Sequence, residues 1–166
     1  MATDETRWLS EEEQQSWRAY IMGTTMLMDQ LDRELQQAHG ISMPEYEILV
    51  RLSESPDHSV RMAILADALS YSRSRTTHTV KRLENMGLIR REAIPGDGRG
   101  VAAVMTEAGW DLLVAAAPTH VNGVRDHLVE QASAEDFAAI GRVFDRVSDQ
   151  LLGSNPACAE VDIRNH

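Results

Sequence analysis

Residues 59–105 read SVRMAILADALSYSRSRTTHTVKRLENMGLIRREAIPGDGRGVAAVM, and this stretch decides the fold. Apolar side chains at three- and four-residue spacing predict two short helices, at 62–69 and 72–86. Ser72 is a favourable N-cap residue, and Gly87 supplies the left-handed conformation that ends many helices. Two short helices joined by a tight turn are typical of a helix-turn-helix.

The hydrophobic period changes to two after the second helix. Residues 89–93 alternate, so odd-numbered side chains should lie on one face of a strand and even-numbered side chains on the other. Residues 95–98 contain Pro, Gly and Asp, which favour a turn, and 101–105 are typical of a returning strand. The pattern predicts a β-hairpin wing, with a further short strand at 59–60.

The charge of the chain is unevenly distributed. The whole sequence carries a net charge of −10, which is unexpected for a protein that binds a polyanion. Between His58 and Met105, however, eight arginines and lysines face four carboxylates, a net charge of +4, so the remainder carries −14. A basic island in an acidic chain indicates one face that meets an anion, although an ordinary solvated surface would also account for it.

The helix at 72–86 must bury one face and expose the other. Thr76, Thr79, Val80 and Leu83 share one stripe, which leaves cationic and hydroxyl side chains outside. Arginine can fork onto guanine, and hydroxyls can bind phosphates or base edges, so this helix is predicted to read a major groove. The alternative is a set of ordinary exposed helix residues. The predicted DNA-binding residues are Ser72, Arg73, Ser74, Arg75, Thr77, His78, Lys81 and Arg82, together with Arg99 in the wing.

The tip of the hairpin carries its own prediction. Asp97 stands two residues before Arg99, with a glycine between them. An ion pair between the two would orient the arginine toward a narrow minor groove, where the negative potential is strongest. The alternative is a surface turn whose ion pair contributes little.

N-cap residues predict four further helices, which start at Ser10, Ser42, Thr106 and Ser133. Ser10 and Ser42 are each followed three residues later by a glutamate, which completes a capping box. Pro118 is expected to bend the helix that starts at Thr106, because proline removes a backbone donor.

We expect residues 1–166 to form one unit, mainly α with a small β-hairpin wing. Residues 42–106 would be the winged helix-turn-helix lobe. Residues 9–40 and 107–152 would be dimerisation helices, because they carry more apolar side chains than the lobe can cover. A two-fold dimer sets two recognition helices about one DNA turn, ~34 Å, apart. Residues 153–166 are expected to be a disordered tail.

A string of residues along the lobe strengthens this interpretation. It runs through Arg61, Leu65-Ala66, Leu69, Ser72-Arg73-Ser74, Arg82-Leu83-Glu84, Gly87-Leu88-Ile89, Asp97-Gly98-Arg99 and Val104-Met105-Thr106-Glu107-Ala108-Gly109. The string resembles the MarR family of bacterial regulators. The resemblance implies a homodimer that binds a pseudo-palindrome on double-stranded DNA, usually as a repressor released by a small molecule. A cytoplasmic location is expected on a separate ground, because the single cysteine, Cys158, favours a reducing compartment. The sequence departs from the family in Met105, where leucine is usual, and in Thr76 and Thr79, where aliphatic residues are commoner.

Aromatic and methionine side chains gather where the MarR family binds effectors. Such linings accept varied apolar or aromatic molecules, although core and dimer packing would account for the same residues. Tyr20 and Tyr46 lie on the inward stripes of successive helices, so their rings are expected to converge. The predicted effector-binding residues are Trp17, Tyr20, Thr24, Tyr46 and Leu49.

Other classes of protein have less support. The polar, acidic start of the chain does not fit a signal peptide, and no apolar run is long enough to span a bilayer. We expect no cofactor, no metal site and no enzymatic activity, because no catalytic constellation or metal-ligand spacing stands out. The alternative function is a thiol redox sensor that uses Cys158, although its neighbours are apolar and acidic rather than basic.

Overall fold

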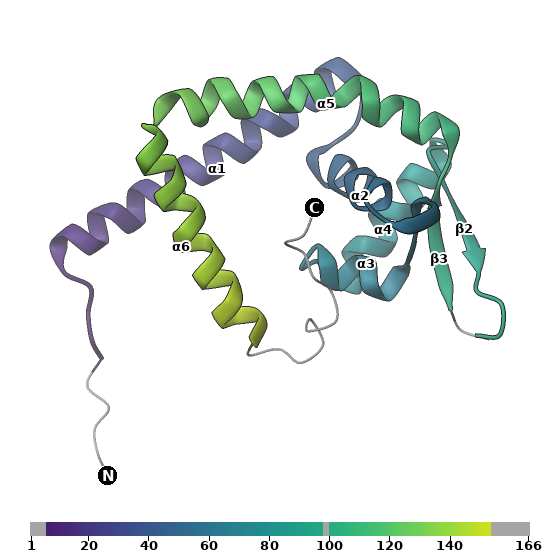
Figure 1. The fold of residues 1–166 in the computed structure, drawn as a ribbon, viewed down its shortest axis with the longest axis horizontal. Helices are drawn as coiled ribbons and strands as arrows, with labels where there is room; N and C mark the ends of the chain where they lie inside the picture. Colours follow the sequence, from purple (N-terminus) through teal and green to yellow (C-terminus); the bar gives the residue numbers. More distant parts are fainter. Residues whose placement is uncertain (1–5, 98–99, 154–166) are drawn as a thin grey trace, which may run out of the picture.

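The computed structural model describes residues 6–97 and 100–153. Within these residues the fold is mainly helical, and the predicted helices and hairpin are confirmed (Figure 1). The elements in chain order are α1 (Glu11–His39), α2 (Met43–Ser53), η1 (Pro56–His58), β1 (Ser59–Arg61), α3 (Met62–Ala68), α4 (Arg73–Asn85), β2 (Ile89–Ala93), β3 (Val101–Met105), α5 (Glu107–His127), η2 (Val129–Gln131) and α6 (Ala134–Gly153).

The three strands form one antiparallel sheet in the order β1-β3-β2. In the hairpin, Ile89 lies opposite Met105, and Ser59 of β1 pairs with Val104 on the other edge of β3. Four consecutive residues of the central strand, 102–105, are buried, whereas in β2 Ile89 alone is buried. The predicted strand at 89–93 is confirmed, but β2 extends beyond the core after its first residue, so neither of its faces is buried past Ile89.

The helix starts follow the predicted capping chemistry. The Ser10 hydroxyl accepts the Glu13 amide at 3.1 Å, and the Glu13 carboxylate accepts the Ser10 amide at 2.8 Å. The Thr106 hydroxyl accepts the Gly109 amide at 3.1 Å and so caps α5. The same helix continues through Pro118 to its end without a break.

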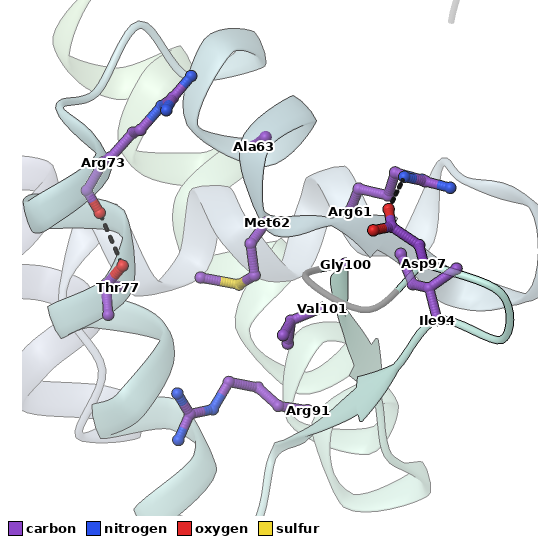
Figure 2. A pocket seen from close by; sticks show the side chains of 10 residues that line it. All are labelled: Arg61, Met62, Ala63, Arg73, Thr77, Arg91, Ile94, Asp97, Gly100 and Val101. Carbon is purple, nitrogen blue, oxygen red and sulfur yellow. Dashed lines mark hydrogen bonds and ion pairs between the residues drawn. The ribbon is translucent and has the colours of Figure 1, made fainter.

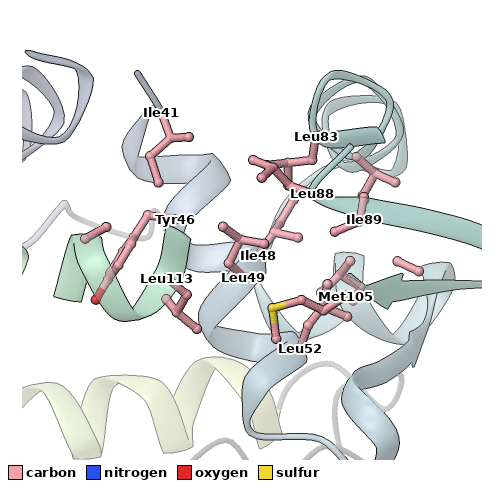
Figure 3. Close-up of a cluster of buried hydrophobic side chains, with 14 of the residues drawn as sticks. Ile41, Tyr46, Ile48, Leu49, Leu52, Leu83, Leu88, Ile89, Met105 and Leu113 are labelled. Carbon is pink, nitrogen blue, oxygen red and sulfur yellow. The ribbon is translucent and has the colours of Figure 1, made fainter. Parts of the chain in front are cut away.

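The core is built around α2, which lies between the sheet, α4 and α5 (Figure 3). Figure 3 shows Leu83, Leu88 and Ile89 on one side of α2 and Leu113 of α5 on the other. The buried hydrophobic cluster consists of Leu35, Ile41, Tyr46, Ile48, Leu49, Leu52, Leu65, Val80, Leu83, Leu88, Ile89, Ala103, Met105, Leu113 and Ala116. This cluster joins the helix-turn-helix, the sheet and the middle of α5 into one unit and so fixes where α4 stands.

The N-terminal part of α1 and the C-terminal part of α5 extend away from this lobe (Figure 1). Helix α6 follows the C-terminal end of α5. The two long helices pack closely at Gly123, where an added Cβ would lie 2.5 Å from the Glu34 carboxylate. His127 binds the same carboxylate at 2.7 Å, and this hydrogen bond is the main reason that the pKa of Glu34 is lowered. None of the described helices combines the length and hydropathy needed to cross a membrane.

Candidate DNA-binding surface

Helix α4 buries the stripe that the sequence predicts and exposes the rest. Thr76 and Thr79 are buried with Val80 and Leu83. The two threonine hydroxyls donate to backbone carbonyls one turn earlier, Thr76 to Ser72 at 3.3 Å and Thr79 to Arg75 at 3.0 Å. The threonines therefore pack without unsatisfied donors. The exposed residues include all eight that were predicted on this helix and its cap: Ser72, Arg73, Ser74, Arg75, Thr77, His78, Lys81 and Arg82.

Residues of α3, α4 and the wing line a hollow of about 440 Å³. Three arginines line it: Arg61 at the end of β1, Arg73 at the start of α4, and Arg91 in β2 (Figure 2). Figure 2 shows Arg73 across the side chain of Met62 from Arg61, and Arg91 reaching from its strand toward α4. Arginines from three separate elements therefore line one concave surface, which suits the phosphates of a nucleic acid.

Two of these arginines are held by carboxylates. Arg61 lies 2.8 Å from the carboxylate of Asp97. Arg91 binds Glu84 of α4 through Nε at 2.9 Å and through Nη2 at 2.6 Å. This two-point contact raises the pKa of Arg91 and lowers that of Glu84. The contact of Arg91 with Glu84 fixes the wing against α4, and the contact of Arg61 with Asp97 ties the end of β1 to the hairpin turn.

The predicted ion pair at the hairpin tip stays a prediction, because Gly98 and Arg99 lie outside the described residues. What the structure adds is the contact of Asp97 with Arg61. That contact spans 36 positions in the sequence, so the local spacing of Asp97 and Arg99 gave no signal for it.

Arg82 has a structural partner that the sequence did not reveal. Its Nε lies 2.7 Å from Oε1 of Glu45, a carboxylate that is only 1% exposed. The other oxygen of Glu45 accepts the Ser42 amide and hydroxyl at 2.7 and 2.8 Å. Arg82 therefore forms an ion pair with a buried carboxylate between α2 and α4, and more than half of its side chain stays exposed. The geometry of the contact is that of a charge pair and not of a hydrogen bond, because Oε1 accepts no hydrogen bond within the described residues.

Replacing Arg82 with alanine is expected to lower the free energy of unfolding by about 1–3 kcal/mol, since a buried acceptor loses its compensating group. Equilibrium denaturation in urea measures this change, with Lys81→Ala as the control because Lys81 is an exposed neighbour on the same helix. If the Arg82 variant unfolds at the same urea concentration as the wild type, the ion pair with Glu45 contributes nothing to stability.

The predicted effector residues fall into two separate groups. Trp17 and Tyr20 of α1 pack on each other with ring centroids 5.7 Å apart, and Tyr20 stacks on Phe144 of α6 at 5.3 Å. Thr24 is exposed on the same helix.

Tyr46 and Leu49 lie instead in the core of the lobe. There the Tyr46 ring packs on the ring of His120 of α5, with ring centroids 4.8 Å apart. The expected convergence of Tyr20 and Tyr46 was wrong, because the first half of α1 runs away from α2 (Figure 1).

Other kinds of site have little support in the described part of the chain. No group of three or more His, Cys, Asp and Glu side chains in residues 6–97 and 100–153 is placed to hold a metal ion. Cys158 lies outside these residues, so the redox alternative stays a prediction.

Known proteins with similar sequences and structures point the same way. The sequence profile of the MarR family matches residues 41–101. The curated regulator PecS of Dickeya dadantii is 26% identical over 139 residues, 81% of this chain and 83% of PecS. Two MarR family regulators from Streptomyces coelicolor are more similar. Sco3205, solved in complex with DNA, is 41% identical with a TM-score of 0.84 and covers 87% of this chain and 94% of its own. AbsC is 40% identical with a TM-score of 0.83 and covers 89% and 99%.

Both comparisons cover more than four fifths of this chain, so they include long helices as well as the lobe. This chain therefore belongs to the MarR family, and it is a non-enzymatic, DNA-binding transcriptional regulator built on a winged helix-turn-helix.

Proposed function

We propose that this regulator is a homodimeric repressor of a pseudo-palindromic operator, and that a small apolar or aromatic molecule releases it. The observation that carries the proposal is the exposed α4 beside a hollow lined by three arginines. Helix α4 would enter the major groove, and the wing would reach the adjacent minor groove. The proposed contacts are Ser72, Arg73, Ser74, Arg75, Thr77, His78, Lys81, Arg82 and Arg99. The structure of the similar Sco3205 in complex with DNA supports DNA as the partner.

The long helices support the dimer. Exposed apolar side chains cover α1, α5 and α6, more than a monomer usually leaves in water. They include Trp17, Ile21, Met22, Met26, Trp110, Val114, Val121, Phe137, Ile140, Val143 and Val147. A two-fold dimer would bury them through residues 9–40 and 107–152 and would place two copies of α4 on successive turns of DNA.

Sedimentation velocity tests the dimer and the operator together. The molecular mass obtained for the free protein should be twice the 18.5 kDa of the chain. A duplex carrying the inverted repeat should bind one such dimer, whereas a duplex with one half-site scrambled should bind much more weakly. A monomeric species bound to a single half-site with full affinity would contradict the proposal.

A second hollow, of about 410 Å³, is the proposed effector site. Apolar side chains of Met43, Val50 and Leu69 line it beside Tyr46 and His120. The charged side chains of Glu47, Arg51 and Glu54 also line it. Burial lowers the pKa of His120, so the ring is neutral at physiological pH. Its Nδ1 is buried and has no hydrogen-bond partner within the described residues. A hollow with apolar, aromatic and charged side chains in its wall suits a small aromatic molecule that carries a polar group.

Filling this hollow should abolish the response to the effector. We expect that a panel of monocyclic phenols and benzoates contains a compound that weakens operator binding of the wild type by about 5- to 150-fold. The variant Val50→Trp should still bind the operator but should not respond, because the indole occupies the cavity. Fluorescence anisotropy of a labelled operator measures both. If Val50→Trp responds like the wild type, the effector binds elsewhere, and the exposed Trp17 and Tyr20 group is the next candidate.

A further inference from the structure

Tyr71 connects the recognition helix to α2. It lies in the turn between α3 and α4, and its hydroxyl donates a hydrogen bond to the Glu47 carboxylate of α2. The guanidinium carbon of Arg75 lies 3.9 Å from the centre of the Tyr71 ring. A carboxylate, a phenol and a guanidinium from three parts of the lobe therefore form one chain of contacts.

The backbone of the turn holds the tyrosine at its base. The Tyr71 amide donates to the Ala66 carbonyl at 3.0 Å, and the Ser70 amide donates to the Asp67 carbonyl at 3.1 Å. Ser70 has a φ of 53°, a left-handed conformation that turns the chain sharply. Ser72, which directly follows Tyr71, caps α4. The ring is thus fixed at its Cα by the turn and at its hydroxyl by Glu47.

A guanidinium group stacked on a ring keeps its hydrogen-bonding ability. The attraction uses the flat face of the group, whereas its N–H donors point outward in the plane. Arg75 is exposed on α4, so these donors are available to phosphates or base edges. Stacking also removes side-chain freedom that the arginine would otherwise lose on binding DNA.

We propose that Tyr71 is a positioning residue for DNA binding: held by Glu47, its ring sets the guanidinium of Arg75 in the orientation that contacts the operator. The inference rests on the proposed role of α4 in the major groove. It adds a residue that belongs to the turn rather than to the exposed face of the recognition helix. Burial and the hydrogen bond to Glu47 raise the pKa of Tyr71 to about 12, so the hydroxyl keeps its proton throughout the pH range of a binding experiment.

A double-mutant cycle on operator affinity tests this role. Tyr71→Leu removes the ring and Arg75→Ala removes the guanidinium, while Tyr71→Phe keeps the ring and loses only the hydroxyl. We expect Tyr71→Leu to weaken operator binding by about 2- to 30-fold for each of the two chains of the dimer that loses the contact. This is the range of a cation–π contact. Tyr71→Phe should weaken it less. In the Arg75→Ala background, Tyr71→Leu should have almost no further effect.

The cycle separates this inference from the proposed function. If Arg75→Ala leaves operator affinity unchanged, the proposed contact of Arg75 with DNA fails. If Arg75→Ala weakens binding and Tyr71→Leu does not, only the positioning role of Tyr71 fails. If the two losses add in full, Tyr71 acts through the general stability of the lobe, which overturns the inference. Thermal unfolding of each variant, followed by far-UV circular dichroism, confirms that binding is measured on folded protein.

Discussion

Replacing Arg73 with alanine is expected to weaken operator binding by roughly 30-fold to 25,000-fold. Arg73 is the first residue of α4 and lines the hollow between this helix and the wing. A good arginine contact to a base contributes about 1–3 kcal/mol, and a dimer loses it twice, which gives about 2–6 kcal/mol. Because the side chain is exposed, the stability of the free protein should be unchanged. Titration of labelled operator at fixed salt measures the effect.

Arg146→Ala is the matched control, because Arg146 is an exposed arginine on α6, outside the candidate surface. This variant should bind the operator like the wild type. Equal affinity of the Arg73 variant, the control and the wild type would show that α4 does not insert its first turn into the groove.

Gly109→Ala is expected to destabilise the whole lobe by about 3 kcal/mol or more. A Cβ at Gly109 would lie 2.1 Å from the backbone carbonyl oxygen of Leu88 and 3.0 Å from Cγ of Met105. The carbonyl cannot move aside easily, because it accepts the Thr106 amide at 3.1 Å. The first turn of α5 would have to lift away from the start of β2. For a chain of this length the melting temperature should fall by about 6–12 °C or more.

Gly141→Ala in α6 separates this steric effect from a general effect of glycine replacement. Nothing lies within 4 Å of a Cβ built on Gly141. Alanine is favoured over glycine inside a helix by about 0.5–1 kcal/mol, so this variant should match or slightly exceed the stability of the wild type. Differential scanning calorimetry compares the two variants. A Gly109 variant that melts with the wild type would mean that α5 can shift without cost at this crossing.

Local rules explain why the sequence predicts most of the fold. A capping box needs two residues three positions apart, and a buried helix stripe needs apolar side chains at regular spacing, so both are visible in the sequence. Ser10 with Glu13 and the buried stripe of α4 were predicted in this way and are confirmed. The exposed side of α4 follows from the same periodicity, because residues off the buried stripe must face solvent.

Contacts between distant residues account for what the sequence did not predict. Arg82 with Glu45, Arg61 with Asp97 and Tyr71 with Glu47 each join side chains at least 24 positions apart. No periodicity selects one carboxylate among the many in an acidic chain as the partner of a given arginine. The effector residues show the same limit. Tyr20 and Tyr46 were both predicted on inward stripes, but Tyr20 is exposed and stacks on Phe144 of α6, whereas Tyr46 is buried against His120 of α5.

The carboxylates beside Arg61 and Arg91 also determine how the protein responds to ionic strength. When a free cationic side chain neutralises a phosphate, the DNA releases a condensed counterion, and each release steepens the fall of affinity with salt. Asp97 and Glu84 already neutralise Arg61 and Arg91 in the free protein. Each arginine that exchanges its carboxylate for a phosphate leaves an anion close to the DNA, which draws a cation back. The number of counterions released is therefore smaller than the number of arginines at the surface.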